Sequence, residues 1–150
     1  MSANHDIAKL DDLIVTTIDS VKGYEHAAET APRGCYTPFF HEMARERREV
    51  VDGLQLRSRT LGGTPADYGS AAGTLHRAFE SLRAALGAGE EAIVKHIENG
   101  EDYLKEEYER VLDDERTSPE TLAIVRCAYD SVRRGHDWAH RLKEELSETA

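Results

Sequence analysis

Four polar residues occupy positions on or beside the apolar stripes of predicted helices. In the stretch 93–112, apolar residues recur at the spacing of one helical face, and Glu101 lies on that face. Arg47 and His136 interrupt two other stripes in the same way, and Asp19 lies beside a third. A charged side chain aimed into a core must find a partner, so these residues predict either buried ion pairs or a metal site.

The first interpretation is a polar layer that neutralises its own charges. Counted from one end of the predicted helices, all four residues lie about three turns along the helix axis, and therefore at one level. Asp19 is then expected to pair with Arg47. Glu101 is expected to pair with His136. Such a layer has nearly balanced charges and holds the helices in one register.

The second interpretation is a metal site. Carboxylates and imidazoles that face one another inside a helical bundle bind two iron or manganese ions, typically with a Glu-x-x-His motif on each of two helices. The chain contains no such motif, and its nearest substitutes are acidic pairs with the same spacing and Asp137-x-x-His140. The candidate ligands of a reduced or single-metal site for iron, manganese or zinc are Glu25, Glu46, Glu98, Glu101, His136 and His140. We prefer the ion-pair interpretation, because the guanidinium of Arg47 at the same level would repel a metal ion.

These side chains require four long helices to position them. Apolar periodicity, with proline and glycine at the boundaries, predicts helices over residues 6–30, 36–61, 90–114 and 119–147. Short connections make the first two and the last two helices antiparallel hairpins, whereas residues 62–88 are long enough to make the middle two parallel. The expected fold is therefore all-α: a ferritin-like four-helix bundle with one long crossover, formed by residues 1–150 as a single domain with a flexible lead-in over residues 1–5.

The crossover is predicted to contain a helix of its own over residues 71–86. His76 and Arg77 lie beside the apolar face of this helix. They either reach the polar layer or face solvent, and we expect solvent.

Composition excludes several classes of function. The net charge is −10 and no block of lysine or arginine stands alone, so a nucleic-acid partner is not expected. No apolar run approaches the roughly 18 residues of a membrane span, and the N-terminus lacks the basic and apolar regions of a signal peptide. Cys35 and Cys127 have no CxxC spacing, which disfavours a thiolate zinc site and fits a reducing compartment. We expect a cytoplasmic protein without a membrane partner.

Several short stretches, taken in order, resemble a known family. They are Gly23-Tyr24 with Ala27-Ala28-Glu29, Leu61-Gly62-Gly63-Thr64-Pro65, Gly69-Ser70 through Leu75-His76-Arg77, Glu98-Asn99-Gly100-Glu101-Asp102 with Tyr108, and His136-Asp137. The chain resembles a bacterial family of chains of this length, catalogued as a domain of unknown function in the ferritin-like superfamily. The resemblance implies a ferritin-like bundle and no particular enzyme activity, and members are suggested to bind metal or to serve in stress responses. It singles out Glu98, Glu101, His76 and His136, which match the family's motif positions.

Together, these observations predict a non-catalytic, stress-related bundle protein with no assured cofactor. It is expected to act through self-association or protein partners, with a homodimer as the expected oligomer. The alternative is a metal-binding protein with an oxidase or metal-handling role, although ferroxidase chemistry is not expected without the full di-iron pattern.

Overall fold

The computed structural model describes residues 2–30, 36–69 and 90–149. Within these ranges it contains four α-helices and no strand, which confirms the predicted all-α class for this part of the chain. The helices are α1 (Ala3–Thr30), α2 (Thr37–Thr60), α4 (Glu90–Leu112) and α5 (Pro119–Thr149). Of these helices, none has the length and apolarity needed to cross a lipid bilayer. The predicted crossover helix, with His76 and Arg77, lies outside the described residues.

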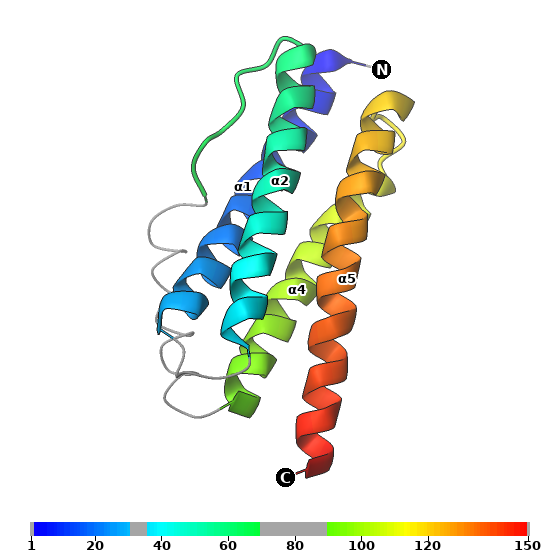
Figure 1. Ribbon diagram of the computed structural model, residues 1–150. Helices are drawn as coiled ribbons and strands as arrows, with labels where there is room; N and C mark the ends of the chain where they lie inside the picture. Colours follow the sequence, from blue (N-terminus) through cyan, green and yellow to red (C-terminus); the bar gives the residue numbers. More distant parts are fainter. Residues whose placement is uncertain (1, 31–35, 70–89, 150) are drawn as a thin grey trace.

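The four helices lie side by side as a bundle (Figure 1). Helix α1 packs against α2 and α4, and α5 packs against α4 and α2. Helices α2 and α4 run in one direction, and α1 and α5 run in the opposite direction (Figure 1). Each of these contacts therefore joins antiparallel neighbours, and α2 and α4 face each other diagonally across the core.

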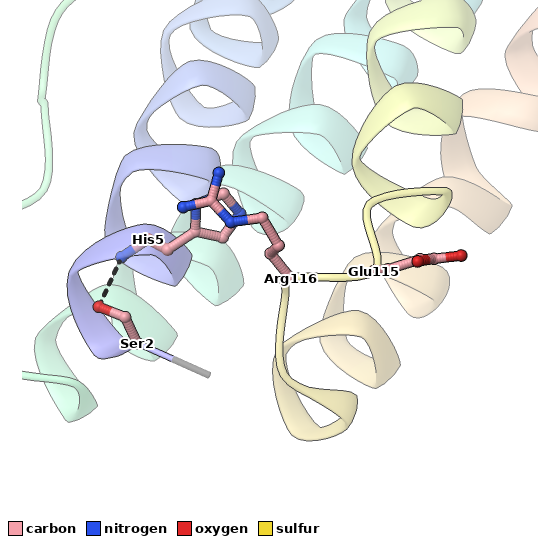
Figure 2. A pocket seen from close by; sticks show the side chains of 4 residues that line it. All are labelled: Ser2, His5, Glu115 and Arg116. Carbon is pink, nitrogen blue, oxygen red and sulfur yellow. Dashed lines mark hydrogen bonds between the residues drawn. The ribbon is translucent and has the colours of Figure 1, made fainter.

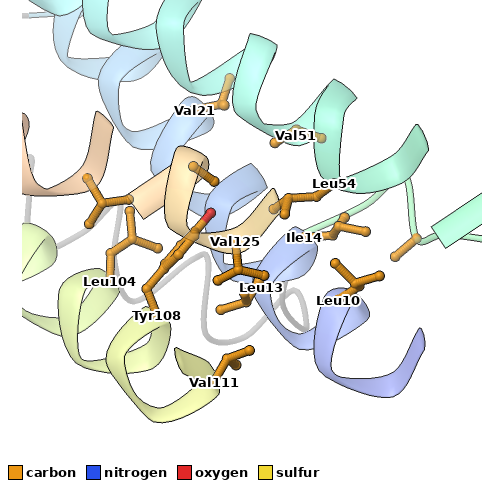
Figure 3. Close-up of a cluster of buried hydrophobic side chains, with 13 residues drawn as sticks. Leu10, Leu13, Ile14, Val21, Val51, Leu54, Leu104, Tyr108, Val111 and Val125 are labelled. Carbon is orange, nitrogen blue, oxygen red and sulfur yellow. The ribbon is translucent and has the colours of Figure 1, made fainter. Parts of the chain in front are cut away.

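Two clusters of buried apolar side chains fill the described part of the bundle. The N-end cluster, near the start of α1, contains Leu10, Leu13, Ile14, Val21, Val51, Leu54, Ala66, Leu104, Tyr108, Val111, Val125, Ala128 and Val132 (Figure 3). The C-end cluster contains Tyr24, Ala27, Ala28, Phe40, Met43, Ala44, Ile93, Ile97 and Ala139. Every helix contributes to both, and the change from one cluster to the other falls at 21–24 in α1, 44–51 in α2, 97–104 in α4 and 132–139 in α5.

Helix α1 begins earlier than the sequence predicts. It starts at Ala3, three residues before the predicted start, and so includes residues 3–5 of the expected lead-in. The reason is a set of contacts between the first turn of α1 and the turn before α5. Nε2 of His5 lies 2.8 Å from Oδ2 of Asp114, and the carboxylate of Asp6 is buried against Ser118. The other helix ends lie within two residues of those predicted.

Asp6 caps α5 from a distant part of the chain. One carboxylate oxygen accepts the backbone N–H of Ser118 at 3.1 Å, and the other accepts the hydroxyls of Ser118 at 2.5 Å and Thr121 at 2.7 Å. Burial alone raises the pKa of Asp6, but these hydrogen bonds outweigh it and hold the pKa below its ordinary value. Asp6 therefore satisfies donors at the start of α5 that would otherwise have no helical partner.

The end of α2 is set by two glycines. Gly62 has a φ of +90°, which an L side chain rarely adopts. Its N–H donates to the carbonyl of Arg59 at 2.9 Å, and the N–H of Gly63 donates to the carbonyl of Ser58 at 2.8 Å. These two bonds form a Schellman motif, which ends the helix at the glycine pair.

Candidate functional site

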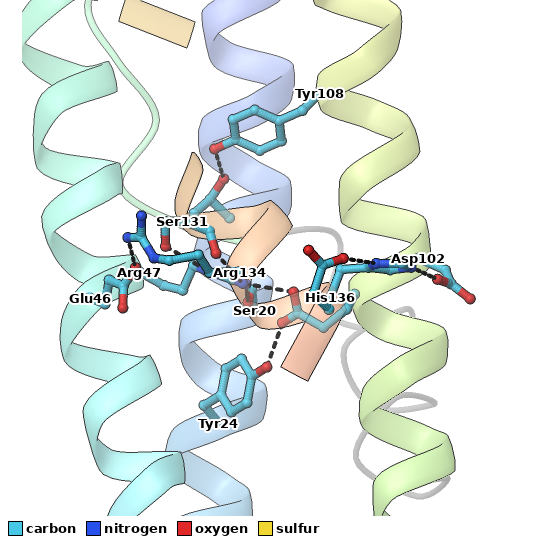
Figure 4. Close-up of polar contacts among 12 residues, drawn as sticks. Ser20, Tyr24, Glu46, Arg47, Asp102, Tyr108, Ser131, Arg134 and His136 are labelled. Atoms are coloured by element: carbon cyan, nitrogen blue, oxygen red, sulfur yellow. Dashed lines mark hydrogen bonds and ion pairs between the residues drawn. The ribbon is translucent and has the colours of Figure 1, made fainter. Parts of the chain in front are cut away.

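The boundary between the two apolar clusters is a layer of buried polar side chains (Figure 4). At its centre, Nη2 of Arg47 on α2 lies 2.7 Å from Oε2 of Glu101 on α4. The two side chains are 0% and 3% exposed. A single charge at such a depth would be strongly unfavourable, so each of the two groups depends on the other.

The other two described helices, α1 and α5, contribute hydrogen bonds to this pair. Arg47 donates to the hydroxyl of Ser20 on α1 at 2.8 Å, and to the hydroxyl and carbonyl of Ser131 on α5 at 3.3 and 3.4 Å. The phenol of Tyr24 on α1 donates to Oε1 of Glu101 at 2.5 Å. The guanidinium carbon of Arg47 also lies 5.7 Å from the centre of the Tyr24 ring. Both charges therefore have partners within the protein.

The electrostatics of the layer keep three of its groups in one ionisation state near neutral pH. Burial, followed by the negative charge of Glu101, raises the pKa of Tyr24 well above its ordinary value. Burial lowers the pKa of Arg47, but the Glu101 carboxylate outweighs it, so the net shift is upward. Burial raises the pKa of Tyr108 to about 12, although its hydroxyl lies 2.8 Å from that of Thr17. None of these three groups is therefore suited to exchanging a proton at pH 7.

A glycine of α5 makes room for the ion pair. A Cβ atom at Gly135 would overlap with Nη2 of Arg47 and would come within 2.8 Å of Oε2 of Glu101 and 3.0 Å of Cε of Met43. A side chain at this position would therefore displace the ends of Arg47 and Glu101 from their paired positions. Glycine inside a helix is itself a sequence signal that calls for a packing reason, and our sequence analysis did not use it.

The structure corrects the predicted pairing of the layer. Arg47 pairs with Glu101 instead of Asp19, and Nε2 of His136 lies 2.6 Å from Oδ1 of Asp102 instead of Glu101. His136 lies at the α4–α5 surface with 21% of its side chain exposed. Asp19 is partly buried, and its carboxylate lies close to the backbone of Gly69.

The physical reason for this difference is angular. Counting residues from the helix ends gives the level of a side chain, but successive residues differ by about 100° around a helix axis. At the level of Asp19, the side chain that points into the interior is that of Ser20. One turn later it is that of Tyr24. The sequence analysis overlooked Ser20 and Ser131 because small hydroxyl side chains are common on both faces of a helix.

The four carboxylates predicted as metal ligands each form an ion pair with a protein cation. At 2.6 to 2.8 Å, Glu25 pairs with Arg48, Glu46 with Arg134, Glu98 with Lys143 and Glu101 with Arg47. A carboxylate neutralised in this way attracts a metal ion less strongly. In residues 2–30, 36–69 and 90–149, no three His, Cys, Asp or Glu side chains are placed to hold one metal ion. In this arrangement the four carboxylates of the predicted ligand set lie in separate ion pairs, and no three of the predicted ligands converge on one ion.

The two histidines of the predicted set lie together on the seam between α4 and α5. Their rings are parallel, with centroids 6.4 Å apart. Nδ1 of His140 lies 3.1 Å from Oε2 of Glu98, which is buried. Burial raises the pKa of Glu98, but hydrogen bonds from Lys143 and His140 outweigh it and lower the pKa. The structure thus brings Glu98 and His140 together, while Glu101 lies in the interior and His136 on the surface.

A small polar pocket lies at the far end of the bundle, beside the start of α1 (Figure 2). It is lined by Ser2, His5, Glu115 and Arg116, which the sequence analysis did not single out. The backbone N–H of His5 donates to the hydroxyl of Ser2 at 3.4 Å. The pocket is separated from the Arg47 layer by the N-end cluster, so it does not belong to the same site.

Comparison with known proteins gives a family. No curated protein matches the chain in sequence. A family model described as "Domain of unknown function (DUF2383)" matches residues 5–114. The matched range contains α1 from its third residue onward, and all of α2 and α4 with Arg47 and Glu101, while α5 lies beyond it. Because the match covers more than half of its length, the chain belongs to the DUF2383 family.

Proposed function

We propose that this protein is a non-catalytic helical bundle of the ferritin-like superfamily that acts through association with itself or with protein partners. The observation that carries this proposal is the closed network around Arg47 and Glu101. Its two charges are buried, paired with each other between α2 and α4, and hydrogen-bonded by side chains of α1 and α5. A site that binds a substrate or a metal needs donor atoms that are not already engaged in this way.

In this proposal the polar layer has a structural role. A buried ion pair is seldom stabilising overall, since desolvation offsets most of the Coulombic attraction. It does penalise every packing in which the two charges separate. A shift of α2 against α4 by one turn, about 5.4 Å, would leave both charges buried without partners. The layer therefore selects one register and keeps the outer helix faces in a defined arrangement for a partner.

Association is supported by the apolar side chains on the outer surface. Leu56 on α2 and Tyr103 on α4 are 64% and 57% exposed. Multi-angle light scattering of the purified chain tests this part of the proposal, and we expect twice the mass of one chain. Leu56→Ser and Tyr103→Ser then identify the face involved, because only the variant in the interface should yield a monomer. A monomer at every concentration, with no partner recovered by crosslinking in cells, would contradict association.

The bacterial origin, the ferritin-like superfamily, the cytoplasmic location and the stress-related role are finer parts of the proposal. The superfamily and the stress role come from the family resemblance, and the location comes from cysteine usage. Stress survival of a deletion strain, compared with a strain carrying the restored gene, tests the stress role. Equal survival under oxidative, acid and osmotic stress would remove it.

The alternative is a metal-binding protein that handles iron, manganese or zinc. The observation in its favour is the seam between α4 and α5, where His136 and His140 face Asp102 and Glu98. Those side chains would have to rotate to converge on one ion. Elemental analysis of untagged protein, purified without chelator and again after anaerobic iron loading, separates the two functions. The structural proposal expects far less than one metal per chain, and stoichiometric metal that disappears in His136→Ala would establish the alternative.

A further inference from the structure

The polar layer separates two apolar clusters, and we propose that it is also a boundary of cooperativity. In this proposal, the half of the bundle that holds the C-end cluster opens as a unit while the half that holds the N-end cluster stays packed. The inference concerns how the bundle opens, and it holds whether or not the proposed association is correct.

The first step is the separation itself. The N-end and C-end clusters share no residue, and each helix passes from one to the other at the level of the layer. At that level the interior is filled by Ser20, Arg47, Glu101, Ser131 and Gly135. Apolar side chains couple to their neighbours by excluding water from shared surface. Where polar groups intervene, this coupling between the two halves is weakened.

The second step is the effect of water on the layer. Opening of the C-end half would bring water to the buried charges of Arg47 and Glu101. Hydration of these ions is favourable, because burying them carried a desolvation penalty. An apolar layer at the same level would instead lose hydrophobic stabilisation on exposure. The charged layer therefore lowers the free energy of the half-opened state.

The third step is the direction of the hydrogen bonds. Arg47 donates to Ser20 and Ser131, which lie on the N-end side of the layer, next to Val21 and Val132 of the N-end cluster. From the C-end cluster, Tyr24 contributes its hydroxyl and its ring to the layer. When the C-end half opens, the guanidinium keeps its contacts with both serines and water replaces the Tyr24 hydroxyl on Glu101.

The fourth step is a polar clamp at the N-end. Thr121 at the start of α5 donates to Asp6 of α1 and accepts from Nε of Arg57 of α2 at 3.1 Å. His5 pairs with Asp114 beyond the end of α4. These contacts link the helices at the outer limit of the N-end half. Polar contacts between helices therefore lie at both ends of this half, here and at the Arg47 layer.

In the C-end half, the buried carboxylate of Glu98 on α4 lies 2.8 Å from Nζ of Lys143 and 3.1 Å from Nδ1 of His140, both on α5. The other described contacts between helices there are aromatic or exposed. Phe39 of α2 stacks on Trp138 of α5 with ring centroids 3.4 Å apart. The ion pair between Glu25 and Arg48 is largely exposed, at 44% and 60%, and such pairs contribute little to stability. Opening from this side therefore breaks fewer buried polar contacts among the described residues than opening from the N-end.

Native-state hydrogen exchange of the full chain in low concentrations of guanidinium tests the proposal directly. C-end amides should share one opening, with protection factors at least about tenfold lower and a smaller denaturant dependence than N-end amides. The C-end amides are those of residues 25–29, 40–44, 93–97 and 138–144. The N-end amides are those of residues 8–18, 51–58, 104–111 and 123–132. One common protection factor and denaturant dependence for both groups, or earlier opening of the N-end half, would overturn the proposal.

Trp138 is the only tryptophan of the chain and lies against the C-end cluster, so its fluorescence reports on that half. We expect its unfolding transition at a lower denaturant concentration than the loss of helical circular dichroism. In the double variant Arg47→Met with Glu101→Leu, the two transitions should merge, because the layer becomes apolar. The matched control, Arg48→Met with Glu25→Leu, alters an exposed ion pair of the same kind and should leave the transitions separate. Coincident transitions in the unmodified protein, or transitions that stay separate in the layer variant, would contradict the inference. If the layer variant does not fold, the exchange measurement on the unmodified protein decides alone.

Discussion

Substitution of Glu101 by glutamine removes one charge of the buried pair and keeps the shape of the side chain. Arg47 is 0% exposed and would retain its positive charge, with the hydroxyl of Ser20 and the hydroxyl and carbonyl of Ser131 as its remaining partners. Breaking a buried ion pair by removing one partner costs about 3–5 kcal/mol. Because the glutamine carbonyl still accepts one hydrogen bond, we expect a loss at the lower end, about 3 kcal/mol in the free energy of unfolding.

The assay is guanidinium-induced unfolding, followed by circular dichroism and by Trp138 fluorescence. The free energy of unfolding is fitted separately for each of the two signals. For a chain of this size, the expected loss corresponds to a fall of roughly 6–12 °C in the thermal midpoint. Arg47→Met should cost a similar amount, since it leaves the carboxylate of Glu101 buried without its cation. The double variant Arg47→Met with Glu101→Gln should cost less than the sum of the two by about 2–3 kcal/mol, because it leaves neither charge behind.

The control is Glu25→Gln, which breaks the exposed pair with Arg48. It should change the free energy of unfolding by less than about 1 kcal/mol. The dependence of the two charges on each other is refuted if Glu101→Gln costs no more than this control, or if the effects of Arg47→Met and Glu101→Gln are additive. Either result would mean that the pair is solvated or that its members do not depend on each other.

Three further predictions follow from single residues. Gly135→Ala should destabilise the protein, because the new Cβ would overlap with Arg47. The control is Gly53→Ala, since nothing lies within 4 Å of a Cβ at that position. The control should raise the free energy of unfolding by about 0.5–1 kcal/mol, measured by chemical denaturation. Folding lowers the pKa of Asp6, so the contribution of Asp6 to stability is complete above the ordinary pKa of 3.8 and is lost as the pH falls through the lower pKa of the folded state. Asp6→Asn should therefore flatten this acidic part of the plot of stability against pH. Folding raises the pKa of Tyr108, so the contribution of Tyr108 to stability is complete below about pH 10 and is lost as the pH rises towards about 12. Tyr108→Phe should reduce this alkaline loss of stability. Circular dichroism together with tyrosinate absorbance measures it. An unchanged acid profile in Asp6→Asn would contradict the hydrogen bonds of Asp6, and an unchanged alkaline profile in Tyr108→Phe would contradict the burial of Tyr108.

Much of the fold could be predicted because its signals are local. Apolar periodicity and the proline and glycine boundaries place most helix ends within two residues of those in the structure. The same periodicity identified Glu101 and Arg47 as charged residues on buried faces, and both are buried. A charge on an apolar stripe is a strong signal because isolated buried charges are so unfavourable.

The partners of those charges could not be predicted in the same way. Arg47 and Glu101 come from helices that face each other diagonally. Their pairing depends on how each helix is rotated about its own axis, and counting residues along the helices does not give that rotation. The contact of Asp6 with Ser118 joins two distant parts of the chain, and an acidic residue in the first turn of a helix is common without such a partner. The space that Gly135 provides depends on how closely α5 approaches the pair, which only the three-dimensional arrangement reveals.

We propose that the Arg47 layer is a structural element and not a metal centre. The most direct test is the thermal midpoint of the protein in chelator and in increasing concentrations of iron, manganese and zinc. A ligand that binds the folded state stabilises it by about 2.7 kcal/mol at one hundred times its dissociation constant. We predict the same midpoint under all of these conditions. A midpoint that rises with metal concentration in the unmodified protein and does not rise in Glu101→Gln would contradict the claim.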